Sequence, residues 1–218
     1  MGIGACRLIA MKAIFYDWGG ANIWLFHIIN DIRFSWLDRL MLLGTFLGDH
    51  SLFPFYLGLL TLFALVRVNL SGQDAAHYRL QANQWMAAIA VFSIAYFLDG
   101  ALLTVLKSYF DYPRPPLALP QGSVQIFGTP EYHHSLPSGH ASFAMLITAS
   151  LWPVMSRRGR VAGMLFVLWV GISRISLGSH FPADVVVGFL SCLTVVLLVN
   201  AVISALMRLV AKRAGGIW

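Results

Sequence analysis

The chain has 218 residues, of which 58% are hydrophobic and only 11% are charged. Soluble domains carry about 25% charged residues, so this composition excludes an ordinary soluble domain. The apolar runs are continuous rather than alternating, which argues against a transmembrane β-barrel. The sequence therefore predicts an all-α, polytopic helical membrane protein. Because no linker or internal repeat is evident, we expect residues 1–218 to form a single membrane-embedded domain.

Five apolar stretches are candidates for spanning helices, which need roughly 20 mostly apolar residues. They cover residues 51–67, 85–106, 139–156, 161–177 and 184–207. The first 50 residues leave two alternatives open, an interfacial amphipathic helix or a poor sixth span. Within them, Leu37 to Leu47 has apolar residues at helical spacing and is a candidate extension of the span that follows. We therefore expect five or six transmembrane helices.

The formal net charge is +6, and the basic residues gather at the ends of the apolar runs. On a soluble protein this charge would suggest nucleic acid, but here it indicates topology signals and contact with anionic membrane lipids. With five spans, the basic clusters at 67–84, 156–160 and 208–213 fall on one side, which the positive-inside rule assigns to the cytoplasm. The segments 107–138 and 178–183 then share the extracytoplasmic face.

Three polar segments open on that extracytoplasmic face. In the first, Lys107 ends a predicted span, and Arg114 follows seven residues later in a Pro-flanked stretch that could fold back over the membrane surface. The plainer interpretation is that Lys107 snorkels at a helix end.

The second polar segment is Pro137-Ser138-Gly139-His140. Ser138 is a natural helix N-cap, Gly139 lets the backbone approach a ligand closely, and His140 lies in the first helical turn. Free amides at a helix N-terminus favour an anion such as phosphate. An ordinary cap followed by an interfacial histidine is the plainer alternative.

The third polar segment runs from Ser173 to Asp184. Arg174 closes one predicted span, and Asp184 lies near the N-terminus of the next, where the helix dipole favours a carboxylate. The four-residue spacing lets Asp184 reach His180, and a carboxylate that fixes one imidazole nitrogen leaves the other free as a nucleophile or base. A capping aspartate and a turn histidine would explain the same pattern without chemistry.

Together, the three segments bring cations, a helix N-terminus and a His–Asp pair to one membrane face, as a phosphate-transfer site requires. A zinc site is the weaker alternative, because the cations Lys107, Arg114 and Arg174 would oppose a divalent ion. We therefore expect neither a metal nor a cofactor. A transporter with a proton relay is disfavoured, since the polar residues gather at one face rather than along a path.

The three segments read KSYFDYPRP, PSGH and SRISLGSHFPAD. These K-x6-RP, PSGH and SR-x5-H-x3-D patterns resemble the type 2 phosphatidic acid phosphatase family, which is related in its site to vanadium haloperoxidases and bacterial acid phosphatases. The resemblance is strong over residues 85–190, the expected catalytic core. It implies metal-independent hydrolysis in which His180 attacks phosphorus, Asp184 orients His180, and His140 protonates the leaving oxygen and then activates water. It also implies that phosphate is held by Lys107, Arg114, Ser138, Gly139 and Arg174.

We expect a multi-pass lipid phosphatase of a bacterial-type inner membrane with its site on the periplasmic side. Undecaprenyl diphosphate is the first candidate substrate. Phosphatidylglycerophosphate, phosphatidic acid and lipid A phosphates are alternatives, as is a lipid-to-acceptor phosphotransferase with the same site. No obligate protein partner is expected.

Two further features remain open. Asp99 lies within a predicted span, about 12 Å deeper than Lys107 at 1.5 Å per residue. An intramembrane carboxylate is a functional candidate, and a structural hydrogen bond between helices is the alternative. The segment Tyr132 to His134 is a candidate for headgroup contact, although we favour a place at the membrane interface for it.

Overall fold

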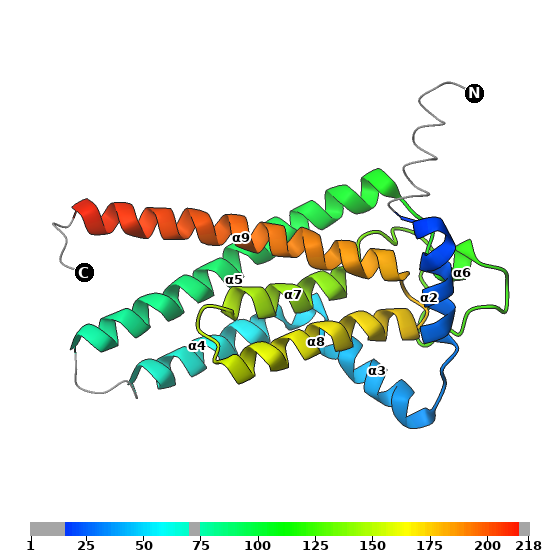
Figure 1. Ribbon diagram of the computed structural model, residues 1–218, viewed down its shortest axis with the longest axis horizontal. Helices are drawn as coiled ribbons and strands as arrows, with labels where there is room; N and C mark the ends of the chain where they lie inside the picture. The colour runs from blue at the N-terminus through cyan, green and yellow to red at the C-terminus, as the bar shows by residue number, and fades with distance from the viewer. Residues whose placement is uncertain (1–15, 70–74, 214–218) are drawn as a thin grey trace, which may run out of the picture.

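A computed structural model of the protein describes residues 16–69 and 75–213, and these residues form helices with no strand. Five helices run along the long axis of the molecule (Figure 1), and they are α4 (Phe53–Asn69), α5 (Ala75–Phe110), α7 (Gly139–Leu151), α8 (Arg157–Ser176) and α9 (Pro182–Arg213). Shorter elements surround one end of this bundle. They are η1 (Trp18–Gly20), α2 (Ala21–Asn30), α3 (Ser35–Leu47), η2 (His50–Leu52) and α6 (Pro115–Ala118).

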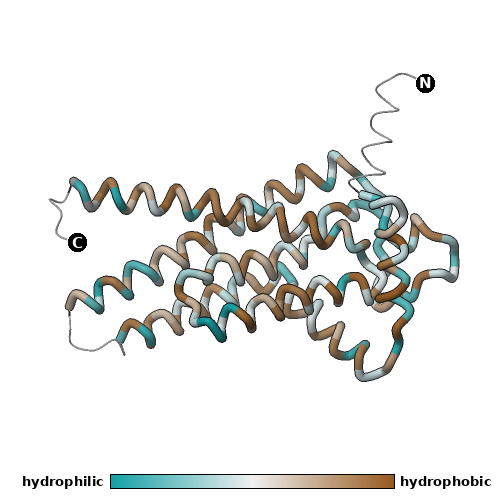
Figure 2. Tube along the Cα trace, in the orientation of Figure 1, coloured by the Kyte–Doolittle hydropathy of each residue, from teal (hydrophilic) through white to brown (hydrophobic). Residues whose placement is uncertain are grey.

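Four helical segments of the described chain are long and apolar enough to cross a membrane, which confirms the polytopic helical membrane fold. They include α4, α5, α8 and α9. Helix α7, predicted as a span over 139–156, is shorter: it has 13 residues, or about 20 Å at 1.5 Å per residue, against a hydrocarbon core about 30 Å thick. It ends at Leu151, and a turn that contains Pro153 precedes α8. Figure 2 shows hydrophilic residues concentrated toward the two ends of the bundle.

Helix α7 lies in the interior of the bundle, in contact with α5, α8 and α9. Its Phe143 is fully buried and packs with Phe92 of α5 and Tyr56 of α4. Gly188 of α9 faces the start of α7, where an added Cβ would lie 2.5 Å from the carbonyl oxygen of Ser138. Only glycine therefore lets α9 approach so closely, and this contact fixes the N-terminus of α7 against the start of α9.

Helix α2 lies across one end of the bundle (Figure 1). It buries Asn22, Phe26 and Asn30, which recur every four residues, while Trp24 and Ile28 on other faces are exposed. This pattern fits the interfacial amphipathic helix rather than the sixth span. Of the region 1–50, the part before residue 16 lies outside the described residues.

Helix α3 does not extend α4, contrary to the candidate extension, because Gly48 to Leu52 interrupts the helix between them. Instead, α3 packs along α8, where the indole nitrogen of Trp169 donates to the carbonyl oxygen of Leu40 at 3.2 Å. Among the described residues neither α2 nor α3 qualifies as a spanning segment.

The three polar segments meet at the end of the bundle that α2 covers. They come from the C-terminal ends of α5 and α8 and the N-terminal ends of α7 and α9. The basic residues Arg67, Arg157 and Arg208 lie at the opposite ends of these antiparallel helices. The sequence therefore predicted correctly that the polar segments share one face.

Candidate active site

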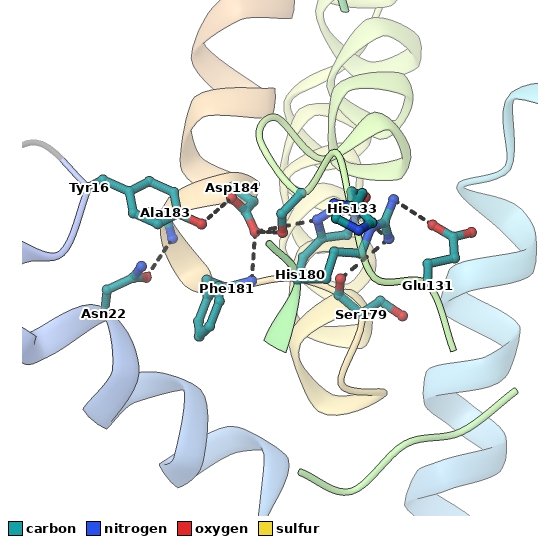
Figure 3. Close-up of polar contacts among 11 residues, drawn as sticks. Tyr16, Asn22, Glu131, His133, Ser179, His180, Phe181, Ala183 and Asp184 are labelled. Atoms are coloured by element: carbon teal, nitrogen blue, oxygen red, sulfur yellow. Dashed lines mark hydrogen bonds and ion pairs between the residues drawn. The ribbon is translucent and has the colours of Figure 1, made fainter. Parts of the chain in front are cut away.

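His180 lies in the turn between α8 and α9 and is 1% exposed. Gly178, with φ of +75°, ends α8 and turns the chain toward it. The Nδ1 atom of His180 lies 3.4 Å from Oδ2 of Asp184, although the two atoms are not aligned for a hydrogen bond. Its Nε2 atom lies 3.3 Å from Nη1 of Arg114. One ring nitrogen therefore faces a carboxylate, and the other faces a cation (Figure 3).

Three donors hold the carboxylate of Asp184 in place (Figure 3). The Ser135 hydroxyl and the Phe181 amide donate to Oδ2 at 2.6 and 2.8 Å, and the Tyr16 hydroxyl donates to Oδ1 at 2.9 Å. Sequence reasoning missed Tyr16 and Ser135. Ser135 precedes the PSGH motif by two residues and could have been found from that proximity, whereas Tyr16 carries no local signal. Asp184 is thus fixed in orientation by residues from three separate parts of the chain.

Helix α2 also fixes the turn that carries His180. The side-chain oxygen of Asn22 accepts from the amide of Ala183 at 2.9 Å, next to Asp184. The side-chain nitrogen of Asn30 donates to the carbonyl oxygen of Ser176 at 2.9 Å, at the end of α8. These two asparagines hold both sides of the turn.

Arg114 is buried, and all three of its guanidinium nitrogens have partners. Nε donates to the His133 carbonyl oxygen at 3.0 Å, and Nη1 lies 3.4 Å from the Ser179 carbonyl oxygen. Nη2 forms an ion pair of 2.5 Å with Oε2 of Glu131, a residue that sequence reasoning missed (Figure 3). Glu131 is exposed, so its carboxylate lies at the rim of the site, where it occupies the Nη2 edge of the Arg114 guanidinium group.

The segment Tyr132 to His134 contacts the first polar segment. The amide of Arg114 donates to the Tyr132 carbonyl oxygen at 2.8 Å. Nδ1 of His134 lies 3.2 Å from the carbonyl oxygen of Lys107 and 3.1 Å from Oδ1 of Asp111. The segment therefore runs alongside Arg114 and contacts it. All three of its residues also line a side cavity of about 530 Å³.

Arg174 is buried at the end of α8. Its Nη1 donates to the hydroxyl of Thr45 on α3 at 3.0 Å. The Thr45 hydroxyl also lies 3.2 Å from the hydroxyl of Ser173. Helix α3, which lies outside the three motifs, therefore orients this arginine.

Ser138 stands at the N-cap position of α7, but its side chain does not make the capping bond that its identity predicts. Its hydroxyl is buried without a hydrogen-bond partner, while its amide donates to the Asp184 carbonyl oxygen at 2.9 Å. At Gly139, an added Cβ would lie 3.1 Å from Cε1 of His50. At the start of α7, the unpaired Ser138 hydroxyl therefore lies next to Gly139, and the His50 ring packs closely on Gly139.

These residues surround a cavity of about 340 Å³. Six of the eight predicted site residues line it, together with residues that sequence reasoning missed, among them His50 and Glu131. The six are Lys107, Arg114, Gly139, His140, Arg174 and His180. Ser138 and Asp184 do not line the cavity, since Asp184 supports His180 from behind and Ser138 precedes Gly139. The cavity adjoins the side cavity, which shares Lys107, Arg114 and Glu131 with it.

Asp99 lies outside the cavity. Its Oδ2 atom accepts a hydrogen bond of 2.5 Å from the hydroxyl of Ser142 on α7, and the carboxyl group is buried. This is the hydrogen bond between helices that the sequence left open as the structural alternative. It links α5 to the helix that carries His140.

The charges of the site favour an anion. Burial, followed by Arg114, Arg174 and Lys107, lowers the pKa of His180 well below its ordinary value, so the ring is neutral near pH 7. Burial and the neighbouring Asp184 raise the pKa of Tyr16, so its hydroxyl remains a donor. Among the described residues, no three His, Cys, Asp or Glu side chains are grouped to hold a metal ion.

Comparison with known proteins assigns the family. The model of the PAP2 superfamily matches residues 85–208, which is more than half of the chain. The chain belongs to the PAP2 superfamily. The resemblance drawn from the three motifs is thereby confirmed, and Tyr16, Thr45 and His50 lie outside the matched region.

Two curated relatives are lipid phosphatases by name. The lipid A 1-phosphatase of Rhizobium johnstonii is 29% identical over 106 residues, which cover 48% of this chain and 42% of that protein. Phosphatidylglycerophosphatase B of Bacillus subtilis is 29% identical over 172 residues, which cover 72% of this chain and 71% of the relative. The chain thus spans less than half the length of the Rhizobium relative.

Two crystal structures share the fold. LpxE of Aquifex aeolicus aligns with a TM-score of 0.65 and 25% identity over 82% of this chain and 94% of the other. The PAP2-type phosphatidylglycerolphosphate phosphatase of Bacillus subtilis aligns with a TM-score of 0.60 and 24% identity, over 91% and 92% of the two chains. The arrangement of membrane helices is therefore that of PAP2 membrane proteins.

Proposed function

We propose that this protein is an integral-membrane lipid phosphatase that acts through a phosphohistidine intermediate. The observation that carries the proposal is the environment of His180. Its Nδ1 side faces the fixed carboxylate of Asp184, and its Nε2 side faces Arg114 at 3.3 Å beside a cavity that Lys107 and Arg174 also line. A neutral imidazole backed by a carboxylate and facing a cationic cavity suits nucleophilic attack on a phosphate.

In the first step, the phosphate group binds between Lys107, Arg114 and Arg174. The Nε2 lone pair of His180 forms a bond to phosphorus while the bond from phosphorus to the lipid oxygen breaks. The electron pair of that bond stays on the lipid oxygen, which takes a proton from His140. Asp184 stabilises the positive charge that develops on the His180 ring.

In the second step, His140 takes a proton from water as the water oxygen attacks phosphorus. The bond between phosphorus and Nε2 breaks, and its electron pair returns to His180, which becomes neutral again. The three cations neutralise the phosphate oxygens in both steps, which is the role a metal ion plays in other phosphatases. We therefore propose that the reaction is metal-independent.

The position of the cavity supports a lipid substrate. It lies at the end of the bundle opposite Arg67, Arg157 and Arg208, which the positive-inside rule favours on the cytoplasmic side. We therefore propose that it opens on the extracytoplasmic side of a bacterial-type inner membrane. Undecaprenyl diphosphate remains the first candidate from the sequence. Phosphatidic acid is a further candidate, and the names of the relatives add phosphatidylglycerophosphate and lipid A 1-phosphate.

The test is phosphate release by the purified full-length protein in detergent from a panel of these four lipids. We expect release from at least one lipid without any acceptor alcohol, which also separates hydrolysis from phosphotransfer. His180→Ala should lower kcat by at least about a thousandfold, as the loss of a catalytic nucleophile does, with an unchanged circular dichroism spectrum. Full activity of His180→Ala, or no release from any lipid by the unaltered protein, would contradict the proposal.

A further inference from the structure

Asp49 lies beside His140, the second histidine of the cavity. Its Oδ2 atom is 3.7 Å from Nε2 of His140. Its other oxygen, Oδ1, accepts a hydrogen bond of 2.7 Å from the amide of Ser51 and thereby caps η2. One oxygen of the carboxylate is thus fixed by the backbone, and the other faces the histidine.

The segment that carries Asp49 is pressed against the site. An added Cβ at Gly48 would lie 2.5 Å from Cγ1 of Val170 and 3.4 Å from the carbonyl oxygen of His140. The next residue, His50, covers Gly139 and packs its ring on Phe143 of α7 at 5.0 Å. The position of Asp49 relative to His140 is therefore set by close packing on both sides.

The other groups around His140 oppose a positive charge on its ring. Burial is the largest cause that lowers the pKa of His140, followed by Arg174 from α8, and His180 and His50 lower the pKa further, whereas Asp49 raises it; these are the four titratable groups of the described chain that act on the ring most strongly. Asp49 is the carboxylate among these four. The acid role proposed for His140 requires a proton on the ring when the lipid oxygen departs, so a nearby anion is needed to keep that proton in a cationic site.

We propose that Asp49 is the positioning residue of the acid–base histidine, so that each histidine of the site has its own carboxylate. This inference rests on the proposed phosphatase function. Asp49 stabilises the protonated His140 ring and orients it. The proton then moves from His140 to the lipid oxygen as the phosphorus–oxygen bond breaks, and Asp49 keeps its charge throughout.

The alternative is that Asp49 only caps η2, and two substitutions separate the roles. Asparagine is as good an N-cap as aspartate, so Asp49→Asn keeps the cap and removes only the charge, whereas Asp49→Ala removes both. We expect both variants to lower kcat for the preferred lipid phosphate about tenfold and to leave KM within about twofold. The effect is limited because the Asp49 side chain is 44% exposed, so solvent screens the pair.

A double-mutant cycle tests whether Asp49 acts through His140. In the His140→Ala background, followed as single-turnover phosphate release over hours, Asp49→Asn should cause no further loss. A purely structural contribution would instead multiply with the effect of His140→Ala. Asp31→Asn is the matched charge control: Asp31 is 61% exposed, lies outside both cavities and contacts His27 at 3.8 Å, at the C-terminal end of α2. We expect this control to keep kcat within about twofold.

Failure of this inference is distinguishable from failure of the proposed function. Wild-type kcat in Asp49→Asn, or multiplying effects in the cycle, would overturn the role of Asp49 while His180-dependent phosphate release persists. Absence of any release, or release that does not depend on His180, would instead overturn the function on which the inference rests.

Discussion

The hydroxyl of Tyr16 donates a hydrogen bond of 2.9 Å to Oδ1 of Asp184, across 168 positions of the chain. The Tyr16 ring is buried and packs edge-on against Tyr112 at 4.5 Å between ring centroids. The hydrogen bond therefore anchors the Asp184 carboxylate, which faces His180, to Tyr16, a residue that precedes all three motifs in the sequence. The segment before the first predicted span is therefore part of the site.

Replacing Tyr16 with phenylalanine removes one of the three donors to Asp184. Hydrogen bonds to charged groups contribute about 1.5–3 kcal/mol, so we expect kcat to fall by about tenfold or more while KM changes less than about twofold. Steady-state phosphate release measures both constants. Tyr109→Phe is the matched control, since Tyr109 is 78% exposed and lies outside the site. Wild-type kcat in Tyr16→Phe would show that Ser135 and the Phe181 amide suffice.

We predict that Glu131 competes with phosphate for Arg114. Its carboxylate pairs with Nη2 of Arg114 at 2.5 Å, so Glu131→Gln should free this edge of the guanidinium group for the substrate. Because an ion pair with an exposed partner is worth about 0–1 kcal/mol, we expect the inhibition constant of vanadate, a phosphate mimic, to fall up to about fivefold. Inhibition curves for the wild type, Glu131→Gln and the charge control Asp31→Asn provide the measurement. Weaker vanadate inhibition would instead indicate that Glu131 holds Arg114 in its productive orientation.

Ser138 and Ser142 differ in the state of their hydroxyl groups: that of Ser138 is unpaired, whereas that of Ser142 donates to Asp99. We therefore predict different effects when each serine is replaced with alanine. Ser138 itself does not line the cavity, but its unpaired hydroxyl adjoins Gly139, which does, and we expect it to turn toward bound phosphate. Ser138→Ala should therefore lower kcat/KM about tenfold through loss of this hydrogen bond, with no loss of thermal stability. Ser142→Ala leaves buried Asp99 without its donor, which should cost about 1–3 kcal/mol of stability. Thermal unfolding in detergent and steady-state kinetics separate the two effects. A lower melting temperature for Ser138→Ala would mean that its hydroxyl has a structural partner.

Chelation tests the metal-independent mechanism. Three cationic side chains are available to neutralise the phosphate oxygens, so EDTA should leave at least about half of the activity. The measurement is phosphate release after incubation with EDTA, with and without added Mg²⁺ or Zn²⁺. Activity that requires an added divalent ion would rule out the proposed role of Lys107, Arg114 and Arg174 as sufficient charge partners.

The sequence predicted six of the residues that line the cavity because two local signals agree. Motif spacing places Lys107 and Arg174 at span ends and His140 at a span start, and alternation of spans then brings these ends to one face. The prediction was less accurate for 139–156, because apolarity continues past Leu151 while the turn at Pro153 ends the helix. Hydropathy cannot distinguish a helix enclosed by other helices from one that spans the lipid.

The supporting residues could not be predicted from the sequence for a different reason. Tyr16, Thr45 and Asp49 reach the site only through tertiary packing, in which α2 contacts α8 and α9, α3 contacts α8, and η2 contacts α7. None of the three residues belongs to a repeated or spaced pattern. Ser138 shows the converse error: its identity and position indicate an N-cap, whereas its hydroxyl is unpaired in the structure.

The contacts of α2, α3 and η2 with the motif residues have a practical consequence for protein engineering. A fragment that contains only the residues matched by the family model, 85–208, would retain all eight motif residues and would still match the three motifs completely. It would nevertheless lack Tyr16, which is one of the three donors to Asp184, the Thr45 hydroxyl that holds Arg174 and the Asp49 carboxylate beside His140. Grafting experiments and minimal expression fragments should therefore begin at or before Tyr16, since a complete signature does not amount to a complete catalytic centre.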